Sequence, residues 1–158
     1  MPETKKDYLL REAIRTLEET IVRTKIAFES ARTDVIEAEG RMKTRYDSSR
    51  TESGYLADGQ AQRLTDFKNS LSHVRQVRLN GMCESVKVGA LVFLCDEEND
   101  SCKQYFLLPG GGGDKLVYQT EEITVLTPQS PLGKQLLGKE EGDEFQFRNN
   151  TYCISELS

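Results

Sequence analysis

The sequence is short of the residues that build metal and redox sites. Its 158 residues include one histidine, His73, and four cysteines, Cys83, Cys95, Cys102 and Cys153. No two cysteines form a C-x-x-C pair, which is the spacing that many structural zinc sites use. We therefore expect no zinc site, and four reduced thiols as in a cytosolic protein.

Long apolar runs are also missing. No stretch approaches the roughly 20 consecutive apolar residues that span a bilayer, and residues 1–7 contain no apolar signal core. Charged residues make up 30% of the chain and hydrophobic residues 37%. These features predict a soluble, cytoplasmic protein with no membrane partner.

Positive charge is scarce in the second half of the chain. Residues 80–158 carry 6 Lys and Arg against 13 Asp and Glu, a net charge of −7, whereas residues 1–79 carry 15 against 13, a net charge of +2. An acidic half disfavours binding to the phosphates of duplex DNA. Any contact with nucleic acid is therefore expected in the N-terminal half.

Proline is absent between Pro2 and Pro109, so no proline ring interrupts a helix there. Apolar residues recur in this region at spacings of three and four, which is the seam of a coiled coil. The seam runs through Leu10, Ile14, Leu17, Ile21, Phe28, Ala31, Val35, Ala38 and Met42, and returns at Ala57, Leu64, Phe67, Leu71 and Val74. Two long helices are predicted.

A polar segment, residues 46–54, separates the two seams. Its Asp, Ser and Gly residues favour turns and helix caps over helix interiors. We interpret residues 1–79 as an antiparallel helical hairpin domain with this segment as its tip, in a monomeric protein. A coiled-coil dimer of one long helix is the alternative.

After residue 80 the pattern changes to the alternation of short strands. Strands are predicted at residues 86–94, 105–108, 115–118, 123–126, 145–148 and 151–154. The pair Asn149-Asn150 suits a two-residue type I′ turn between the last two. The expected fold class is α+β, with a second domain over residues 80–158 that is a small antiparallel sheet with one short helix.

Residues 130–143 mark that short helix. Pro131 suits the first turn of a helix, where its missing N–H would be unpaired in any case. Ser130 can cap the free N–H groups, and Gly138 is placed to end the helix. A tight turn at Gly142 then leads into the next strand.

Two glycine-rich segments look like phosphate-binding loops but lack the required chemistry. Residues 110–113 are four glycines with neither Lys-Ser/Thr nor a helix after them, so we expect a mobile hairpin loop. Gly133, Gly138 and Lys139 match part of a Walker A pattern, but Glu140 stands where the magnesium-binding hydroxyl belongs. Nucleotide hydrolysis is therefore excluded.

Residues 130–143, together with residues 123–125, resemble the C-terminal domain of the bacterial Gre transcript-cleavage factors (the GreA/GreB family). A helical hairpin followed by a small α+β domain is also the order of that family. The resemblance implies an FKBP-like domain that docks on bacterial RNA polymerase through an Asn/Asp-Ser-Pro triplet. Here Gln129, Ser130 and Pro131 occupy those places, with about two extra residues just upstream.

In the Gre factors the hairpin enters the secondary channel of the polymerase. An acidic pair at the tip helps to hold the second catalytic Mg²⁺, and the polymerase then cleaves its own backtracked RNA. Asp47 and Glu52 are the corresponding acids here, five residues apart rather than three, with Arg50 between them. Roles as a turn cap and as a helix-start charge are the alternative for these two acids.

Basic residues flank the tip as well. The candidates for contact with RNA phosphates are Arg41, Lys43, Arg45 and Arg50, although solvated surface charge is the commoner explanation for such residues.

The resemblance predicts an accessory transcription factor and not an enzyme. It would have no cofactor or metal of its own, would act on the Mg²⁺ of the polymerase, and would meet nascent RNA through the polymerase. Two alternatives stay open. One is a Gre-like channel binder that modulates or inhibits transcription without cleavage, and the other is a coiled-coil interaction module unrelated to polymerase.

Overall fold

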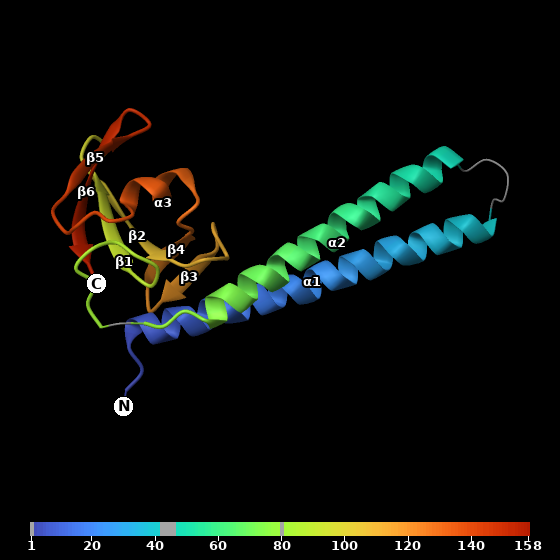
Figure 1. Ribbon diagram of the computed structural model, residues 1–158, viewed down its shortest axis with the longest axis horizontal. Coiled ribbons are helices and arrows are strands. Elements are labelled where there is room, and N and C mark those ends of the chain that lie inside the picture. Colours follow the sequence, from blue (N-terminus) through green and yellow to red (C-terminus); the bar gives the residue numbers. More distant parts are fainter. Residues whose placement is uncertain (1, 42–46, 80) are drawn as a thin grey trace.

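The computed structural model describes residues 2–41, 47–79 and 81–158, and the side chains within residues 2–30, 59–79 and 81–158. Figure 1 shows two long helices that project from a sheet with one short helix. The elements are α1 (Lys5–Arg41), α2 (Asp47–Arg75), β1 (Leu91–Asp96), β2 (Ser101–Leu107), β3 (Lys115–Tyr118), β4 (Glu121–Leu126), α3 (Pro131–Leu136), β5 (Glu144–Phe147) and β6 (Asn150–Leu157). The predicted α+β class is confirmed.

The helices α1 and α2 lie side by side and antiparallel, as the two apolar seams predict (Figure 1). Because the two helices pair with each other, the hairpin is formed within one chain, and the alternative of a single long helix is wrong. A capping box fixes the start of α1, because the backbone N–H of Asp7 donates to Thr4 Oγ1 at 3.1 Å and the N–H of Thr4 donates to Asp7 Oδ2 at 3.1 Å. Among the described residues, no helix combines the length and apolar content that a membrane span needs.

The buried face of α1 is wider than the predicted seam. Leu17 and Ile21 are buried as predicted, but Leu10 and Ile14 are only partly buried, whereas Leu9 is fully buried and Ala13 nearly so. The reason is that α1 packs on two partners, α2 and the sheet. A coiled-coil pattern accounts for only the first of these.

The six strands form one sheet in the order β3-β4-β2-β1-β6-β5. Four neighbouring pairs are antiparallel, but β2 and β4 are parallel, so the prediction of a purely antiparallel sheet is wrong at this pair. The chain leaves β2, forms β3 at the sheet edge and turns back as β4 between β3 and β2. Because β4 reverses β3, it runs in the same direction as β2.

The predicted strand at residues 86–94 begins only at Leu91. A turn precedes it, in which the N–H of Ala90 donates to the carbonyl of Lys87 at 2.9 Å, and Gly89 has a φ of +91°. A left-handed residue interrupts the pleat. The alternating valines of this segment therefore lie mostly outside the sheet.

Two turns also differ from their predictions. The turn before β6 uses Arg148 and Asn149, with φ of 50° and 69°, so the predicted pair was one residue too late. Glycines 110–113 do not close a hairpin, since β2 and β3 are not paired. Gly110 packs on α2, where a Cβ atom added to it would lie 2.7 Å from the Cβ of Ser70.

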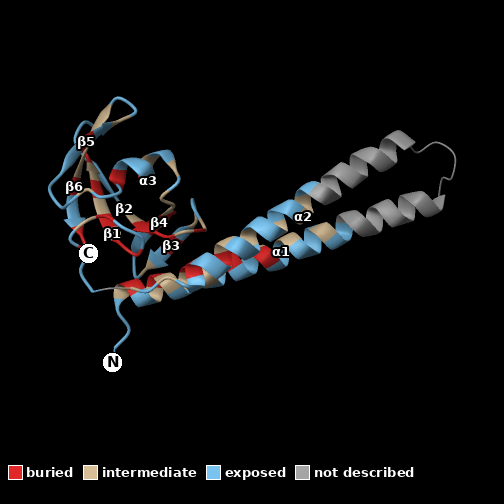
Figure 2. Ribbon diagram, viewed as in Figure 1, coloured by how far each residue is buried: buried red, intermediate tan, exposed pale blue. Residues whose placement is uncertain are grey.

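The sheet divides the interior into two hydrophobic clusters, whose buried residues are red in Figure 2. One joins α1 and α2 to the sheet and includes Phe106, and the other joins α3 to the sheet and includes Leu107. These two neighbours in β2 are both fully buried, because successive side chains point to opposite faces. The C-terminal end of β2 is therefore covered on both sides.

A disulfide joins Cys95 in β1 to Cys102 in β2. The prediction of four reduced thiols is thus wrong for this pair, while Cys83 and Cys153 are free. Cys95 and Cys102 are directly opposite each other in the strand register. Their proximity depends on that register, which spacing along the chain alone does not reveal.

Candidate functional site

The segment Gln129-Ser130-Pro131 forms the start of α3, as predicted. Ser130 is the N-cap, and its Oγ accepts a hydrogen bond from the N–H of Gly133 at 3.1 Å and donates to the carbonyl of Thr127 at 2.7 Å. Pro131 takes the first helical position. The hydroxyl of Ser130 is thus committed to holding the loop in shape.

Gln129 and Pro131 are exposed on either side of the half-buried Ser130. A residue pair that flanks a helix N-cap is held in one backbone conformation, so it loses little freedom when a partner binds. The loop can therefore present an amide and a rigid ring to a partner surface. The segment is a preformed contact surface and has no catalytic chemistry of its own.

Gly133, in the first turn of α3, is a residue that the sequence interpretation did not connect with this loop. A Cβ atom at this position would lie 2.0 Å from the carbonyl oxygen of Thr127 and 2.8 Å from Ser130 Oγ. Only glycine fits against this backbone without a shift. The available signal was a glycine two residues after the helix-opening proline, where most other residues are better helix formers.

The far end of α3 is attached to the segment before β1. Gly138 has a φ of +81°, and its N–H donates to the carbonyl of Val86 at 2.9 Å, while the N–H of Val86 donates to the carbonyl of Lys139 at 2.8 Å. Gly138 thus ends the helix as predicted. Leu136 is fully buried beneath it, and α3 is fixed at both ends.

The base of the hairpin is tied to the sheet by polar and aromatic contacts. Lys5 Nζ donates to Gln104 Oε1 at 3.0 Å and forms an ion pair with Glu121. The rings of Tyr8 and Tyr118 meet edge to face with centroids 5.3 Å apart. Hydrogen bonds from Lys5 and Gln104 hold the pKa of Glu121 below its usual value. These contacts set the direction in which the hairpin leaves the sheet.

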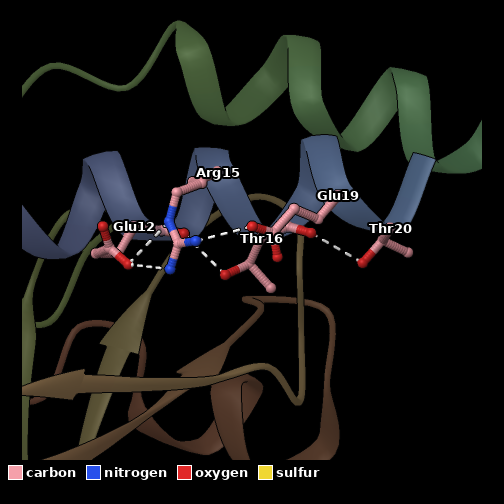
Figure 3. A network of polar contacts seen from close by, with 5 residues as sticks. All are labelled: Glu12, Arg15, Thr16, Glu19 and Thr20. Carbon is pink, nitrogen blue, oxygen red and sulfur yellow. Dashed lines mark hydrogen bonds and ion pairs between the residues drawn. The ribbon is translucent and has the colours of Figure 1, made fainter. Parts of the chain in front are cut away.

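Charged side chains line the exposed face of α1 over its first half. Arg15 donates to Glu12 at 2.7 Å and to Glu19 at 2.8 Å, and Thr16 and Thr20 lie in the same network (Figure 3). The spacings of three and four residues place these partners on one face of the helix. This face is solvated, and its ion pairs add little to stability.

The candidate tip residues lie outside the described side chains. This applies to both acids, Asp47 and Glu52, and to the four basic residues Arg41, Lys43, Arg45 and Arg50. Their predicted roles stay predictions.

A cluster of two acidic residues and one cysteine lies toward the β5 edge of the sheet. Glu97, Glu144 and Cys153 are the one set of three potential metal ligands within 4.8 Å of one another in the part of the chain whose side chains are described. The negative charge of Glu144 raises the pKa of Glu97. Both carboxylates are exposed, and sequence patterns did not indicate this group because its members come from three separate segments.

Sequence comparison finds known proteins that are similar to this chain. Transcription elongation factor GreA of Nitratidesulfovibrio vulgaris is 33% identical over 100 residues, 63% of this chain and 56% of that protein. GreA of a Jannaschia species is 31% identical over 86 residues, 54% of this chain and 51% of that protein. The chain is therefore similar in sequence to the Gre factors. The alignments span about half the length of these relatives, and no protein-family model matches the chain.

Solved structures give a weaker likeness. The GreA factor homolog Gfh1 of Thermus thermophilus has 18% identity and a TM-score of 0.39, over 92% of this chain and 94% of that one. At that level the likeness carries no argument about the site. The similarity to the Gre factors therefore rests on the sequence alignments with GreA, and these alignments confirm the predicted resemblance to that family.

Proposed function

We propose that this protein is a Gre-like transcription factor that binds bacterial RNA polymerase. In this proposal the hairpin enters the secondary channel and stimulates the polymerase to cleave backtracked RNA, while the loop at Gln129, Ser130 and Pro131 docks on the polymerase surface. The protein acts in the bacterial cytoplasm as a monomer and as an accessory factor. The metal is the Mg²⁺ of the polymerase.

The projecting hairpin is the observation that carries the proposal. Helix α2 has 29 residues, which corresponds to a length of about 44 Å at 1.5 Å per residue. Its distal part extends well beyond the sheet (Figure 1). A two-helix rod of this length is suited to reaching into a narrow channel from a domain that stays outside.

The anchoring of the hairpin base supports the same function. The tip of the hairpin can reach a fixed position in a partner only if the base of the hairpin is held rigidly against the sheet. Leu9 and Val74 are fully buried in the cluster shared by the helices and the sheet, and Arg75 of α2 is paired with Glu18 of α1. Docking through the loop before α3 would then fix the hairpin direction relative to the polymerase.

The distribution of charge is consistent with a hairpin that meets RNA and a sheet domain that meets a protein surface. The hairpin half has a net charge of +2 and the sheet half a net charge of −7. A weakly basic rod is better suited than an acidic one to a site that holds RNA phosphates. The acidic sheet half is suited to a protein surface.

Modulation without cleavage is the second candidate function. Asp47 and Glu52 are five residues apart, and Arg50 lies between them in the sequence. A spacing of three or four would place two carboxylates on one helical face, whereas five does not. A tip with this spacing could occupy the channel without supporting a metal ion.

A cleavage assay tests the proposal. Stalled and backtracked elongation complexes with 5′-labelled RNA are incubated with the whole chain, with a GreA protein as positive control. Shortened RNA supports the cleavage function. Binding to the polymerase with RNA of unchanged length would replace it with the modulator function, and no binding to the polymerase would overturn both.

A further inference from the structure

Three cysteines lie in one row across the sheet. In the strand register, Cys95 of β1 is the direct partner of Cys102 in β2 on one side and of Cys153 in β6 on the other. Directly paired residues project from the same face of a sheet. The row therefore places the three side chains on one face in the order Cys153, Cys95, Cys102.

The disulfide occupies only one of the two links that this row allows. Cys95 is bonded to Cys102, and Cys153 is a free thiol. Directly opposed residues in antiparallel strands have Cα atoms about 4.5–5.5 Å apart, and disulfides bridge Cα separations of about 4.4–6.8 Å. A bond between Cys95 and Cys153 is thus within reach with small backbone adjustments.

The order of the row suits an exchange reaction. A thiolate attacks a disulfide sulfur and displaces the other sulfur. Cys153 lies on the strand beside Cys95 on the side opposite Cys102, so an attacking, a central and a leaving sulfur atom would follow one another across the sheet. Cys102 is exposed and Cys153 is half-buried, so water can receive and supply the protons.

We propose that Cys153, Cys95 and Cys102 form a thiol–disulfide exchange site. The Cys153 thiol gives its proton to water, and its sulfur forms a bond to the sulfur of Cys95. The bond between Cys95 and Cys102 breaks, and its electron pair leaves with Cys102, which takes a proton from water. Nothing is oxidised or reduced overall, and no further reactant is needed.

The exchange moves the cross-link and the free thiol. The link changes from a hairpin closure between residues 95 and 102 to a connection between β1 and β6, which closes a much longer loop in the unfolded chain and restricts it more strongly. The free thiol changes from the half-buried Cys153 to the exposed Cys102. The site therefore controls whether this face of the sheet presents a thiol to solvent.

The raised pKa of the Cys153 thiol makes the exchange slow at neutral pH. Burial raises the pKa of the Cys153 thiol, and the carboxylates of Glu144, Glu97 and Asp143 raise it further. These acids come from β5, from the loop after β1 and from the turn before β5, and they face the thiol together. Since only the thiolate attacks, the rate should rise about tenfold for each pH unit until the thiol ionises.

Peptide mapping tests the exchange in the whole chain. The protein is incubated without oxygen at pH 7 and pH 8, quenched in acid, alkylated and mapped by mass spectrometry. We expect Cys95–Cys153 peptides and alkylated Cys102 to appear about ten times faster at pH 8. Cys153→Ser should retain only the Cys95–Cys102 bond, whereas Cys83→Ser, which changes the other free cysteine, should behave as the wild type.

A second variant asks directly whether the two sulfur atoms can meet. Cys102→Ser is treated with oxidised glutathione and should form the Cys95–Cys153 disulfide. If it yields only mixed disulfides with glutathione, the two sulfurs cannot bond and the proposal is overturned. It is equally overturned if the wild type is alkylated only at Cys83 and Cys153 at both pH values. Neither result depends on polymerase binding.

Discussion

A Cβ atom on Gly133 would lie 2.0 Å from the carbonyl oxygen of Thr127. The loop that precedes α3 and the first turn of that helix are therefore in direct backbone contact. Thr127 also accepts hydrogen bonds from the N–H and the hydroxyl of Ser130, at 3.1 Å and 2.7 Å. The shape of the proposed docking loop thus depends on a residue that has no side chain.

Gly133→Ala should disrupt this loop. Since the added methyl group meets backbone and not a flexible side chain, we expect a loss of about 1–3 kcal/mol in the free energy of unfolding. Urea unfolding monitored by circular dichroism measures it. Gly59→Ala is the matched control, because nothing lies within 4 Å of that position on α2, and it should be neutral or stabilising by up to about 1 kcal/mol. Equal effects of the two substitutions would contradict the contact with Thr127.

The seam between the helices and the sheet gives a second prediction. Leu71 is only 8% exposed and belongs to the cluster that joins α2 to α1 and the sheet. Leu71→Ala should cost about 2–4 kcal/mol in the free energy of unfolding through lost burial and a residual cavity. Val22→Ala is the control, since Val22 is 55% exposed on α1, and its cost should stay within about 0.5 kcal/mol. A small loss at Leu71 would mean that the hairpin base is not packed as described.

The sequence predicted the hairpin and the short helix well, because both rest on local signals. Helical periodicity located the seam at Leu17 and Leu71, and the Ser130-Pro131 pair located the start of α3. These signals act over a few residues. They do not depend on which strands are neighbours.

What the sequence could not predict depends on strand register and on packing between distant segments. The parallel pairing of β2 with β4 and the Cys95–Cys102 disulfide both follow from the order of strands in the sheet. Burial of Leu9 follows from the contact between α1 and the sheet. The same limit applies to the row of Cys153, Cys95 and Cys102, whose members are separated by 7 residues on one side and by most of the sheet domain on the other.

Acid sensitivity should come in part from Asp96. Hydrogen bonds from the side chain of Asn99, then from that of Asn150 and from the backbone N–H groups of Glu98 and Asn99, hold the pKa of this carboxyl below its usual value. A folded-state pKa below the unfolded value means that the carboxylate stabilises the protein above its unfolded pKa. That stability is lost as the pH falls through the lower, folded pKa.

Asp96→Asn should therefore reduce the free energy of unfolding at pH 7 and flatten its decline as the pH falls below the ordinary carboxyl pKa of 3.8. Urea titrations at several pH values measure both effects. Asp100→Asn is the control, because Asp100 is exposed and has a φ of 49°, which asparagine tolerates. If Asp96→Asn retained the full pH dependence of the wild type, the hydrogen bonds to Asp96 would not contribute to acid unfolding.

The docking loop can be tested without disturbing its structure. Gln129 is exposed, whereas the hydroxyl of Ser130 is needed for the cap. Gln129→Ala should weaken binding to core RNA polymerase by about 5- to 30-fold if this residue is central to the interface. Gln135→Ala is the control, since it changes an exposed residue on α3 outside the loop. Unchanged affinity of a correctly folded Gln129→Ala protein would contradict docking through this segment.

The tip acids decide between cleavage and modulation. Asp47 and Glu52 are the only acids between residues 41 and 57, so no other carboxylate of the tip could help to hold Mg²⁺. The double variant Asp47→Asn with Glu52→Gln keeps the side-chain sizes and removes both charges. We expect it to bind polymerase like the wild type and to lose at least about tenfold in the rate of RNA cleavage, because a metal ligand stabilises the developing charge. The variant Asp66→Asn changes an exposed acid farther along α2. It should stimulate RNA cleavage as well as the wild type does. Undiminished cleavage by the double variant would remove both acids from the mechanism.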